Sequence, residues 1–449
     1  MKSSHTKSKA WGQKPGLGIM YQIEARPGWR WMRNFDEFNA TMREKNGNFN
    51  FNGPFCRMKD WVSFSRSVGV DYHIFEAKWH DGICYFDSKY TNWKTPVDYC
   101  RIFADESRKA GIPFMFYYSS IFDHNPQFDD IQPLRAATPS FIARHARSAK
   151  EVADFSARFT LWMYEYQKLT PPADVPRNDF TYNPRTYEKY MLDQINELIE
   201  NYKPDGMWID WWMGKVERSA GLIMDFMKTQ YPHVILTFNN SHRGRLKWVH
   251  YTSGEAHTVE SAWEQGHEHR QKESSWELVG PAALRWDNPS ARSDLYEGAR
   301  IAAIIMACGG KFSFGVPAQM DGALYPEPSH HVAAVGNWYQ SRRKLFTEVV
   351  PMPYKGEGVP GVQVSEKDFS TIGNLYGDER LIHVINLHGM KKPLTLKLLG
   401  QYWGNTRQIV LEPEGKKIEV RWQIGTDTGN VVIPEENIDQ VDTILRIKS

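Results

Sequence analysis

The chain has 449 residues, with 55 Lys and Arg against 53 Asp and Glu, and this balance argues against nucleic acid or an anionic membrane as the main partner. Its length exceeds that at which one hydrophobic core usually stops growing, so we expect two domains. Aromatic residues make up 14% of the chain, 17 of them Trp. Exposed rings commonly line carbohydrate grooves, although most rings of a large protein fill its core.

The first 350 residues alternate short apolar runs with amphipathic segments, a pattern typical of strand and helix units around a parallel sheet. The expected strands span residues 18–23, 72–77, 113–118, 206–210, 234–239, 249–253, 283–286 and 311–316. The expected helices span residues 59–67, 97–110, 186–202, 216–230, 293–307 and 331–345. These elements predict an α/β fold of the (β/α)8-barrel type over residues 1–350, with catalytic groups at the C-terminal strand ends.

Helical periodicity stops at about Pro351, and short alternating segments follow. The expected strands here span residues 362–364, 381–385, 394–398, 408–411, 418–422 and 443–447. They predict a small β-sandwich domain over residues 351–449. Pro351 and Pro353 make a plausible junction, because proline stiffens a connection without extending a helix.

One barrel strand carries a carboxylate among tryptophans, in the sequence Trp208-Ile209-Asp210-Trp211-Trp212. Flat indoles suit the C–H faces of a sugar, and a carboxylate suits a developing oxocarbenium centre. The same Asp could instead cap the helix that follows, beside tryptophans of the core. The segment alone leaves both interpretations open.

Metal and nucleotide chemistry have little support in the sequence. The four cysteines form no CxxC pair and are expected to be buried thiols, namely Cys56, Cys84, Cys100 and Cys308. The dense histidine clusters, at residues 266–269 and 329–331, lack the i, i+4 spacing of a zinc pair and are expected to be solvated loop residues. No glycine-rich phosphate loop of the Walker or dinucleotide type occurs, so a nucleotide cofactor is not expected. Taken with the cysteine and histidine spacing, this leads us to expect neither a metal nor another cofactor.

The compartment is left open by the sequence. No stretch of 18 apolar residues exists, and residues 1–5 lack the apolar core of a signal peptide. We therefore expect no membrane insertion. The protein would be cytoplasmic if this start is natural, and periplasmic or secreted if the chain is a processed form.

Five stretches, in order, resemble motifs of the α-L-fucosidases of glycoside hydrolase family 29. Residues 77–93, AKWHDGICYFDSKYTNW, resemble that family's TKHHDGFxxWxSxxT signature. Residues 110–119 resemble its GLKFGLYYS strand, and residues 204–210 its PDxxWFD nucleophile strand. Residues 238–243 are similar to its NxR element, and residues 252–255 to its TxE element.

The resemblance implies a catalytic barrel, a C-terminal β-sandwich and a retaining exo-glycosidase. Asp210 aligns with the nucleophile and Glu255 with the acid/base, and retention needs two carboxyl groups about 5 to 5.5 Å apart. Glu277 is the main rival of Glu255, since several glutamates crowd the same expected loop: Glu260, Glu264, Glu268 and Glu273. The expected substrate-binding residues are Gln22, Trp79, His80, Tyr118, Trp208 and Arg243.

Departures from the family affect the sugar contacts more than the carboxylates. Gln22 and Trp79 replace two histidines, and bulky Trp211 and Trp212 follow the nucleophile. We expect release of a terminal α-L-fucose, or a related L-sugar, from an oligosaccharide or glycoconjugate. A retaining glycosidase for a different sugar and a catalytically silent carbohydrate-binding barrel are the alternatives. The oligomeric state is left open.

Overall fold

The computed structural model describes most of the two predicted domains. The described residues are 11–23, 56–79, 82–120, 184–210, 217–241, 248–270, 275–284, 286, 290, 292–319, 321–356, 358–404 and 406–448. None of the helices in these ranges is long and apolar enough to cross a membrane.

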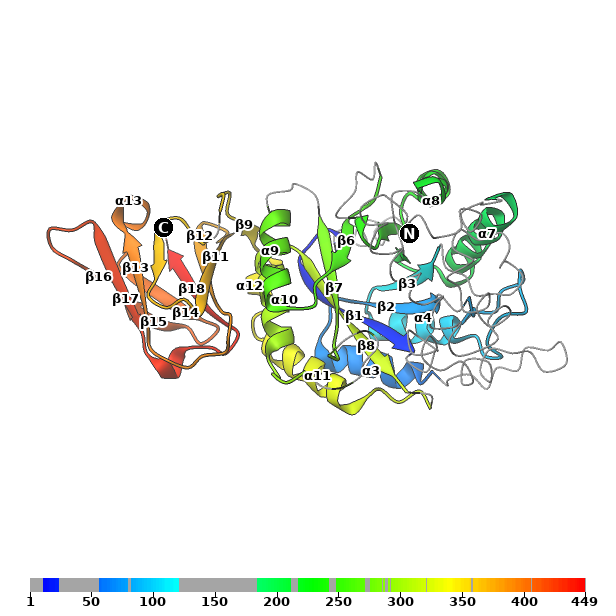
Figure 1. The fold of residues 1–449 in the computed structure, drawn as a ribbon, viewed down its shortest axis with the longest axis horizontal. Coiled ribbons are helices and arrows are strands. Elements are labelled where there is room, and N and C mark those ends of the chain that lie inside the picture. Colours follow the sequence, from blue (N-terminus) through cyan, green and yellow to red (C-terminus); the bar gives the residue numbers. More distant parts are fainter. Residues whose placement is uncertain are drawn as a thin grey trace, which may run out of the picture.

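Eight parallel strands form the sheet of the N-terminal domain (Figure 1). They are β1 (Gly16–Ile23), β2 (Tyr72–Lys78), β3 (Phe114–Ser119), β4 (Gly206–Asp210), β5 (Ile235–Phe238), β6 (Thr252–Glu255), β7 (Trp276–Pro281) and β8 (Lys311–Ala318). The order is β5-β4-β3-β2-β1-β8-β7-β6, so the sheet curls into a nearly closed barrel. The predicted (β/α)8 type of fold is thereby confirmed.

The edges of this sheet, β5 and β6, meet without a strand ladder. Side-chain and loop contacts join them instead. The backbone amide of His250 donates to Leu236 O at 2.9 Å, and the Thr237 hydroxyl donates to Tyr251 O at 2.8 Å. We call this junction the β5/β6 seam.

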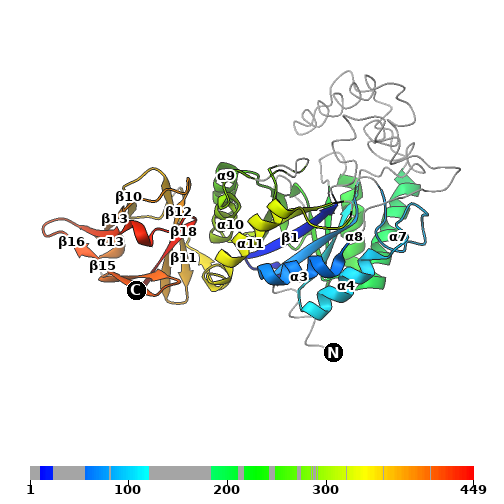
Figure 2. The ribbon, with the colours of Figure 1, turned by 90° about the horizontal axis from the view of Figure 1, so that it is seen from below.

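Helices between the strands cover the outside of the barrel (Figure 2). They are α3 (Met58–Val68), α4 (Tyr99–Ala110), α7 (Pro184–Tyr202), α8 (Glu217–Gln230), α9 (Val259–Arg270), α10 (Glu297–Ala307) and α11 (Pro326–Gln340), followed by α12 (Lys344–Thr347). Local chemistry fixes their ends. Asp98 accepts the backbone N–H of Arg101 at 2.9 Å and so caps α4, and Gly69 ends α3 with a φ of 74° that other residues rarely adopt.

The C-terminal domain is a sandwich of antiparallel sheets, as predicted. One sheet has the order β10-β13-β17-β16 and the other β15-β14-β18-β12-β11-β9. The strands are β9 (Val350–Pro351), β10 (Val362–Val364), β11 (Phe369–Tyr376), β12 (Glu379–Asn386), β13 (Leu394–Leu399), β14 (Gln408–Glu412), β15 (Lys416–Glu419), β16 (Arg421–Trp422), β17 (Thr428–Ile433) and β18 (Asp442–Lys448). The short helix α13 (Gly400–Trp403) follows β13. Strand β9 pairs with β11, so Val350 and Pro351 belong to the sandwich. We propose that the domain boundary lies near residue 350.

Helix α10 lies between the barrel and the sandwich in both views (Figures 1 and 2). Every residue from Gly298 to Ala307 is buried, and Arg300, the one charged residue among them, is paired with Asp294. Ile372, Leu381 and Ile444 of the sandwich belong to the same hydrophobic cluster as the helix. The two domains therefore share a continuous core.

Two barrel strands differ from their predicted positions. The seventh strand is Trp276–Pro281, whereas Ala283 and Leu284 form a bend and Trp286 lies in a turn. The sequence did not predict this strand, because the charged residue Glu277 interrupts its apolar run. The sixth strand begins at Thr252 rather than at residue 249.

A further correction concerns the region expected to be a loop of glutamates and histidines. Glu260, Glu264 and Glu268 lie on α9, as do His267 and His269. His269 is buried and stacks on Trp276, with ring centroids 5.0 Å apart. The four cysteines are buried thiols, as expected.

Candidate active site

Asp210 ends β4 at the mouth of the barrel and is 7% exposed. Alternate residues of a strand face the same side, so Asp210 shares the inward face with Trp208. Strand β3 pairs with β4 and brings Tyr117 opposite Trp208. The Tyr117 hydroxyl donates to Asp210 Oδ2, and the Asn239 amide donates to Oδ1 at 2.9 Å. The carboxylate is thus held from two neighbouring strands.

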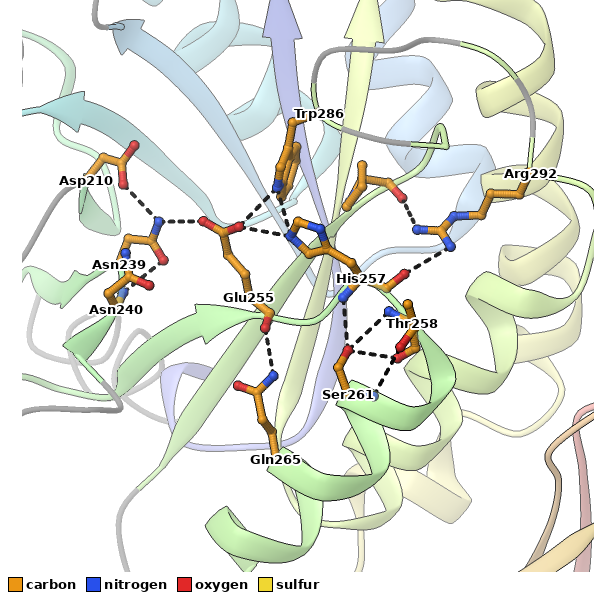
Figure 3. Close-up of polar contacts among 11 residues, drawn as sticks. Asp210, Asn239, Asn240, Glu255, His257, Thr258, Ser261, Gln265, Trp286 and Arg292 are labelled. Carbon is orange, nitrogen blue, oxygen red and sulfur yellow. Dashed lines mark hydrogen bonds and ion pairs between the residues drawn. The ribbon is translucent and has the colours of Figure 1, made fainter. Parts of the chain in front are cut away.

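Glu255 ends β6 on the other side of the seam, and its side chain is 34% exposed. Its Oε1 accepts from the Asn239 amide at 3.0 Å. Its Oε2 lies 2.9 Å from His257 Nε2 and accepts from Trp286 Nε1 at 3.1 Å (Figure 3). Burial alone would raise the pKa of Glu255, but the hydrogen bonds from His257, Asn239 and Trp286 outweigh it and lower that pKa.

A single amide joins the two carboxylates. Asn239 Oδ1 accepts the backbone N–H of Asn240 at 2.9 Å, and this bond turns the amide nitrogen toward Asp210 and Glu255 (Figure 3). Since both carboxylate oxygens contact one nitrogen at 2.9 and 3.0 Å, they lie within about 6 Å of each other. That upper bound is compatible with the carboxyl spacing of about 5 to 5.5 Å in retaining glycosidases.

Trp286 forms a wall of the mouth between Glu255 and β8. A Cβ at Gly315 would lie 2.0 Å from the indole of Trp286 and 3.0 Å from the side-chain oxygen of Gln22. Only glycine therefore permits the ring to lie against this strand. The side chains of Gln22 and Trp286 therefore both lie against Gly315 at the barrel mouth.

Glu277 lies deeper in the barrel. Its register partner on β6 is Ser253, two residues before Glu255. It accepts from Tyr72, from Trp208 Nε1 at 2.9 Å and from Ser253 at 3.2 Å, and it is fully buried. Burial raises its pKa, against the opposing effects of these donors and of Lys311.

The Glu277 cluster supports the floor beneath Asp210. Trp208 stacks on Tyr117 with centroids 5.3 Å apart, and Tyr117 in turn contacts Asp210. Burial lowers the pKa of Lys311 to about 8, although the charge of Glu277 opposes that change. These buried hydrogen bonds hold Trp208 and Tyr117 in place beneath Asp210.

The other expected sugar contacts are distributed unevenly. Trp79 packs against the barrel-interior cluster that contains Trp208. Tyr118 faces outward instead, and its hydroxyl donates to Gln194 of α7 at 2.8 Å. Its neighbour Tyr117 faces inward. His80 and Arg243, together with Trp211 and Trp212, lie outside the described residues.

Sequence reasoning did not single out four residues of this site: Tyr117, Asn239, His257 and Trp286. Asn239 and Tyr117 sit inside motifs that resemble the family. Alternation along β4 does not fix which side the residues of a neighbouring strand face, so the register between strands was needed to place Tyr117 beside Asp210. His257 and Trp286 lie in connections after strands. No spacing in the sequence indicates that they converge on Glu255.

The described residues include no group of three or more His, Cys, Asp or Glu side chains that could hold a metal ion. The polar groups described at the mouth include two carboxylates, the amides of Asn239 and Gln22, the hydroxyl of Tyr117, an imidazole and an indole. Such a set can supply negative charge and move a proton between oxygen and nitrogen atoms.

Comparison with known proteins identifies the family. A model described as Alpha-L-fucosidase matches residues 27–344, whereas no curated protein sequence matches the chain. The structure is similar to that of Thermotoga maritima α-fucosidase with a mechanism-based inhibitor, with a TM-score of 0.67 and 14% identity over 100% of this chain and 99% of that one.

Two further solved structures agree in fold over nearly their full lengths. α-L-Fucosidase isoenzyme 1 from Paenibacillus thiaminolyticus has a TM-score of 0.65 and 19% identity, and covers 99% of each chain. A family 29 α-L-fucosidase from Bacteroides thetaiotaomicron has a TM-score of 0.62 and 17% identity, over 100% of this chain and 95% of that one. Since the family model spans most of the barrel, the chain belongs to the α-L-fucosidase family and is a fucosidase-type glycoside hydrolase.

Proposed function

We propose that the protein is a retaining exo-glycosidase that releases a terminal α-L-fucose, or a closely related L-sugar, from an oligosaccharide or glycoconjugate. The observation that carries this proposal is the Asn239 amide, which contacts both Asp210 and Glu255. A double displacement requires two carboxyl groups close enough to act on opposite sides of one anomeric centre.

In this proposal Asp210 attacks the anomeric carbon and forms a covalent glycosyl-enzyme. Glu255 protonates the leaving oxygen and then removes a proton from the incoming water. The hydroxyl of Tyr117 and the amide of Asn239 hold Asp210 in position. Glu255 is preferred over Glu277 because Glu255 is partly exposed at the strand end, whereas Glu277 is enclosed on all sides.

Gln22, Trp79, Trp208 and Trp286 are proposed to line the sugar subsite. His80 and Arg243 remain proposed contacts from the sequence. A relative with this fold, the Thermotoga maritima enzyme, has been crystallised with fucose. Gln22 and Trp286 meet at Gly315, and this altered corner favours, as a second candidate, a relative of fucose with a different substituent there.

The decisive experiment incubates the purified chain with 4-nitrophenyl α-L-fucoside and a panel of related aryl glycosides, and follows the first product anomer by NMR. We expect α-anomer first, and a loss on the order of 10³-fold or more in kcat for Asp210→Ala. Azide should restore activity to Asp210→Ala with inverted β-glycosyl azide as product. With Glu255→Ala, azide should give the retained α-azide.

A β-anomer as first product would overturn the retaining mechanism. Full activity of Asp210→Ala would remove its role as nucleophile. If no glycoside of the panel is cleaved but an oligosaccharide binds in calorimetry, the catalytically silent carbohydrate-binding barrel replaces the proposal.

A further inference from the structure

The contacts of Glu255 present a chemical problem for a general acid. Asn239 and Trp286 can only donate to it, since the Asn239 oxygen is used by Asn240 and an indole nitrogen has no lone pair to offer. These donors favour the charged carboxylate. A general acid, however, must carry a proton when the substrate arrives.

His257 resolves this problem because its ring nitrogen can either donate or accept. Its Nε2 lies 2.9 Å from Glu255 Oε2. When Glu255 is charged, Nε2–H donates to Oε2. When Glu255 is protonated, its O–H can donate to an unprotonated Nε2, which is the one acceptor among the Glu255 side-chain contacts that the structure describes.

The position of His257 is built into the surrounding fold. Its backbone N–H donates to Ser261 of α9 at 3.1 Å, and its backbone oxygen accepts from Arg292 at 3.2 Å (Figure 3). Trp286 Nε1 lies 3.1 Å from both His257 Nε2 and Glu255 Oε2. Three polar atoms, two from the end of β6 and the residues after it and one from the loop after β7, thus form one triangle.

His257 is also open to solvent, with 44% of its side chain exposed. Imidazole can therefore exchange protons with water while Glu255 faces the substrate. The charged groups around it are Glu255 on β6, Arg292 with its partner Glu297 on α10, and Asp210 on β4 through Asn239. His331 on α11 lies near the same Arg292 and Glu297.

We propose that Glu255 and His257 form a single acid/base unit in which one proton moves between Glu255 Oε2 and His257 Nε2. This inference rests on the proposed hydrolytic function and adds a residue to its machinery. His257 acts through Glu255 and is therefore a positioning residue that also holds the proton.

The protons balance over the two steps. In the first, a proton passes from His257 through the Glu255 carboxyl to the glycosidic oxygen. The C–O bond breaks with its electron pair on that oxygen, while Asp210 bonds to the anomeric carbon. In the second step, water gives a proton to the Glu255 carboxylate, which passes a proton on to His257 Nε2. The water oxygen bonds to the anomeric carbon, and Asp210 leaves.

The test compares the full-length protein with His257→Gln, which retains an N–H donor but cannot carry the proton. The substrates are an aryl α-L-fucoside with an acidic leaving group and a methyl or disaccharide α-L-fucoside with a basic one. We expect a loss of about 10²-fold in kcat/KM on the basic leaving group and a much smaller loss on the acidic one. The shape of the pH profile should change as well.

Trp286→Phe is the matched control, because it removes the other donor to Oε2 without removing a proton carrier. We expect it to lower both rates by a similar factor and to keep the shape of the pH profile. A His257→Gln enzyme with the wild-type pH profile and leaving-group dependence would overturn the proposal.

A second measurement does not depend on turnover. With ¹³C-labelled glutamate, and the Glu255 signal assigned by its loss in Glu255→Gln, NMR follows the carboxyl through a pH titration. Replacing His257 by Phe should raise the pKa of Glu255, and an unchanged titration would overturn the coupling. If the wild-type protein cleaves no glycoside, the proposed function fails by itself, while this titration still decides whether the two residues share a proton.

Discussion

Asn239 is the residue on which the geometry of the site depends most directly. Its two amide protons point to different carboxylates, on either side of the β5/β6 seam. A hydrogen bond to a charged group contributes about 1.5 to 3 kcal/mol, so this side chain stabilises both the position and the charge of Asp210 and Glu255.

Asn239→Ala should therefore reduce kcat/KM on an aryl α-L-fucoside by about 10- to 100-fold, from the loss of one or two such bonds. The matched control is Asn240→Gly, which keeps the backbone N–H and suits the φ of 61° at that position. Steady-state kinetics decide the question. Equal activity of Asn239→Ala and the wild type would mean that the amide does not organise the two carboxylates.

Gly315 controls the mouth in a different way, through the space that it leaves for Trp286. The Gly315→Ala methyl would meet the indole at 2.0 Å, so the ring must move and its bond to Glu255 must weaken. We expect a loss of activity of at least about tenfold with the barrel still folded. Kinetics and thermal unfolding, measured together, check this.

Gly221→Ala is the control for Gly315→Ala. Nothing lies within 4 Å of its added methyl, and the residue lies inside α8. That change should leave activity unaltered and raise stability by up to about 1 kcal/mol. Equal behaviour of the two variants would contradict the role given to the space at Gly315.

At the scale of the elements, the barrel strands place a charged pair, Glu277 and Lys311, in a buried layer below the site. Burial lowers the pKa of Lys311 from 10.5 to about 8. Between these values the unfolded chain keeps the proton and the folded chain releases it. The contribution of Lys311 to stability therefore rises with pH across this window.

Urea unfolding of the wild type and Lys311→Met at several pH values between 7.5 and 9.5 tests this linkage. The free energy of unfolding of the wild type should gain about 2 kcal/mol relative to Lys311→Met over that range. Glu277→Gln removes the charge that opposes the shift, so its rise should begin at lower pH. A constant difference across the range would show that Lys311 does not titrate in this window.

The same strands show how far the sequence could be followed. Apolar runs of four to eight residues predicted six of the barrel strands within two residues, because parallel strands are buried on both faces. Strand β7 was not predicted because Glu277 breaks its apolar run. Helix α9 was not predicted because its many glutamates and histidines look like a polar loop in the sequence. Tertiary hydrogen bonds stabilise both features, and no local pattern encodes such partners.

The site was predictable to the extent that it lies on strands. Asp210 and Glu255 end β4 and β6, where the barrel fold places catalytic groups. The motif alone could not show that Tyr117 rather than Tyr118 lies at the site, since only the register against Trp208 shows which ring faces inward. His257 and Trp286 required three-dimensional proximity.

At the scale of the whole molecule, α10 makes the barrel and the sandwich one structural unit. Its buried face continues into the sheet of β11, β12 and β18, where His383 and Asp442 form a fully buried pair with Nδ1 and Oδ2 2.6 Å apart. Separate unfolding of the sandwich would expose the apolar surface of α10. We expect one cooperative unfolding transition for both domains.

Ile444→Ala tests this cooperativity, since Ile444 is fully buried in the shared cluster. The change should cost about 2 to 5 kcal/mol and lower the temperature at which catalytic activity is lost, although the residue belongs to the other domain. Calorimetry and activity after heating are the measurements. A second, separate transition with unaltered heat inactivation would mean that the domains unfold independently.

The β5/β6 seam is the one strand junction of the barrel that backbone pairing does not fix, and the two carboxyl groups of the site lie across it. Asp210 and Asn239 stand on one side of the seam and Glu255 on the other, where no ladder of backbone bonds fixes the strands together. The Asn239 side chain, rather than a ladder of strand pairing, therefore bridges the gap between the two carboxyl groups. Backbone pairing constrains the other seven strand junctions of the barrel, so the spacing of these two carboxyl groups is the part of the barrel mouth that strand pairing constrains least.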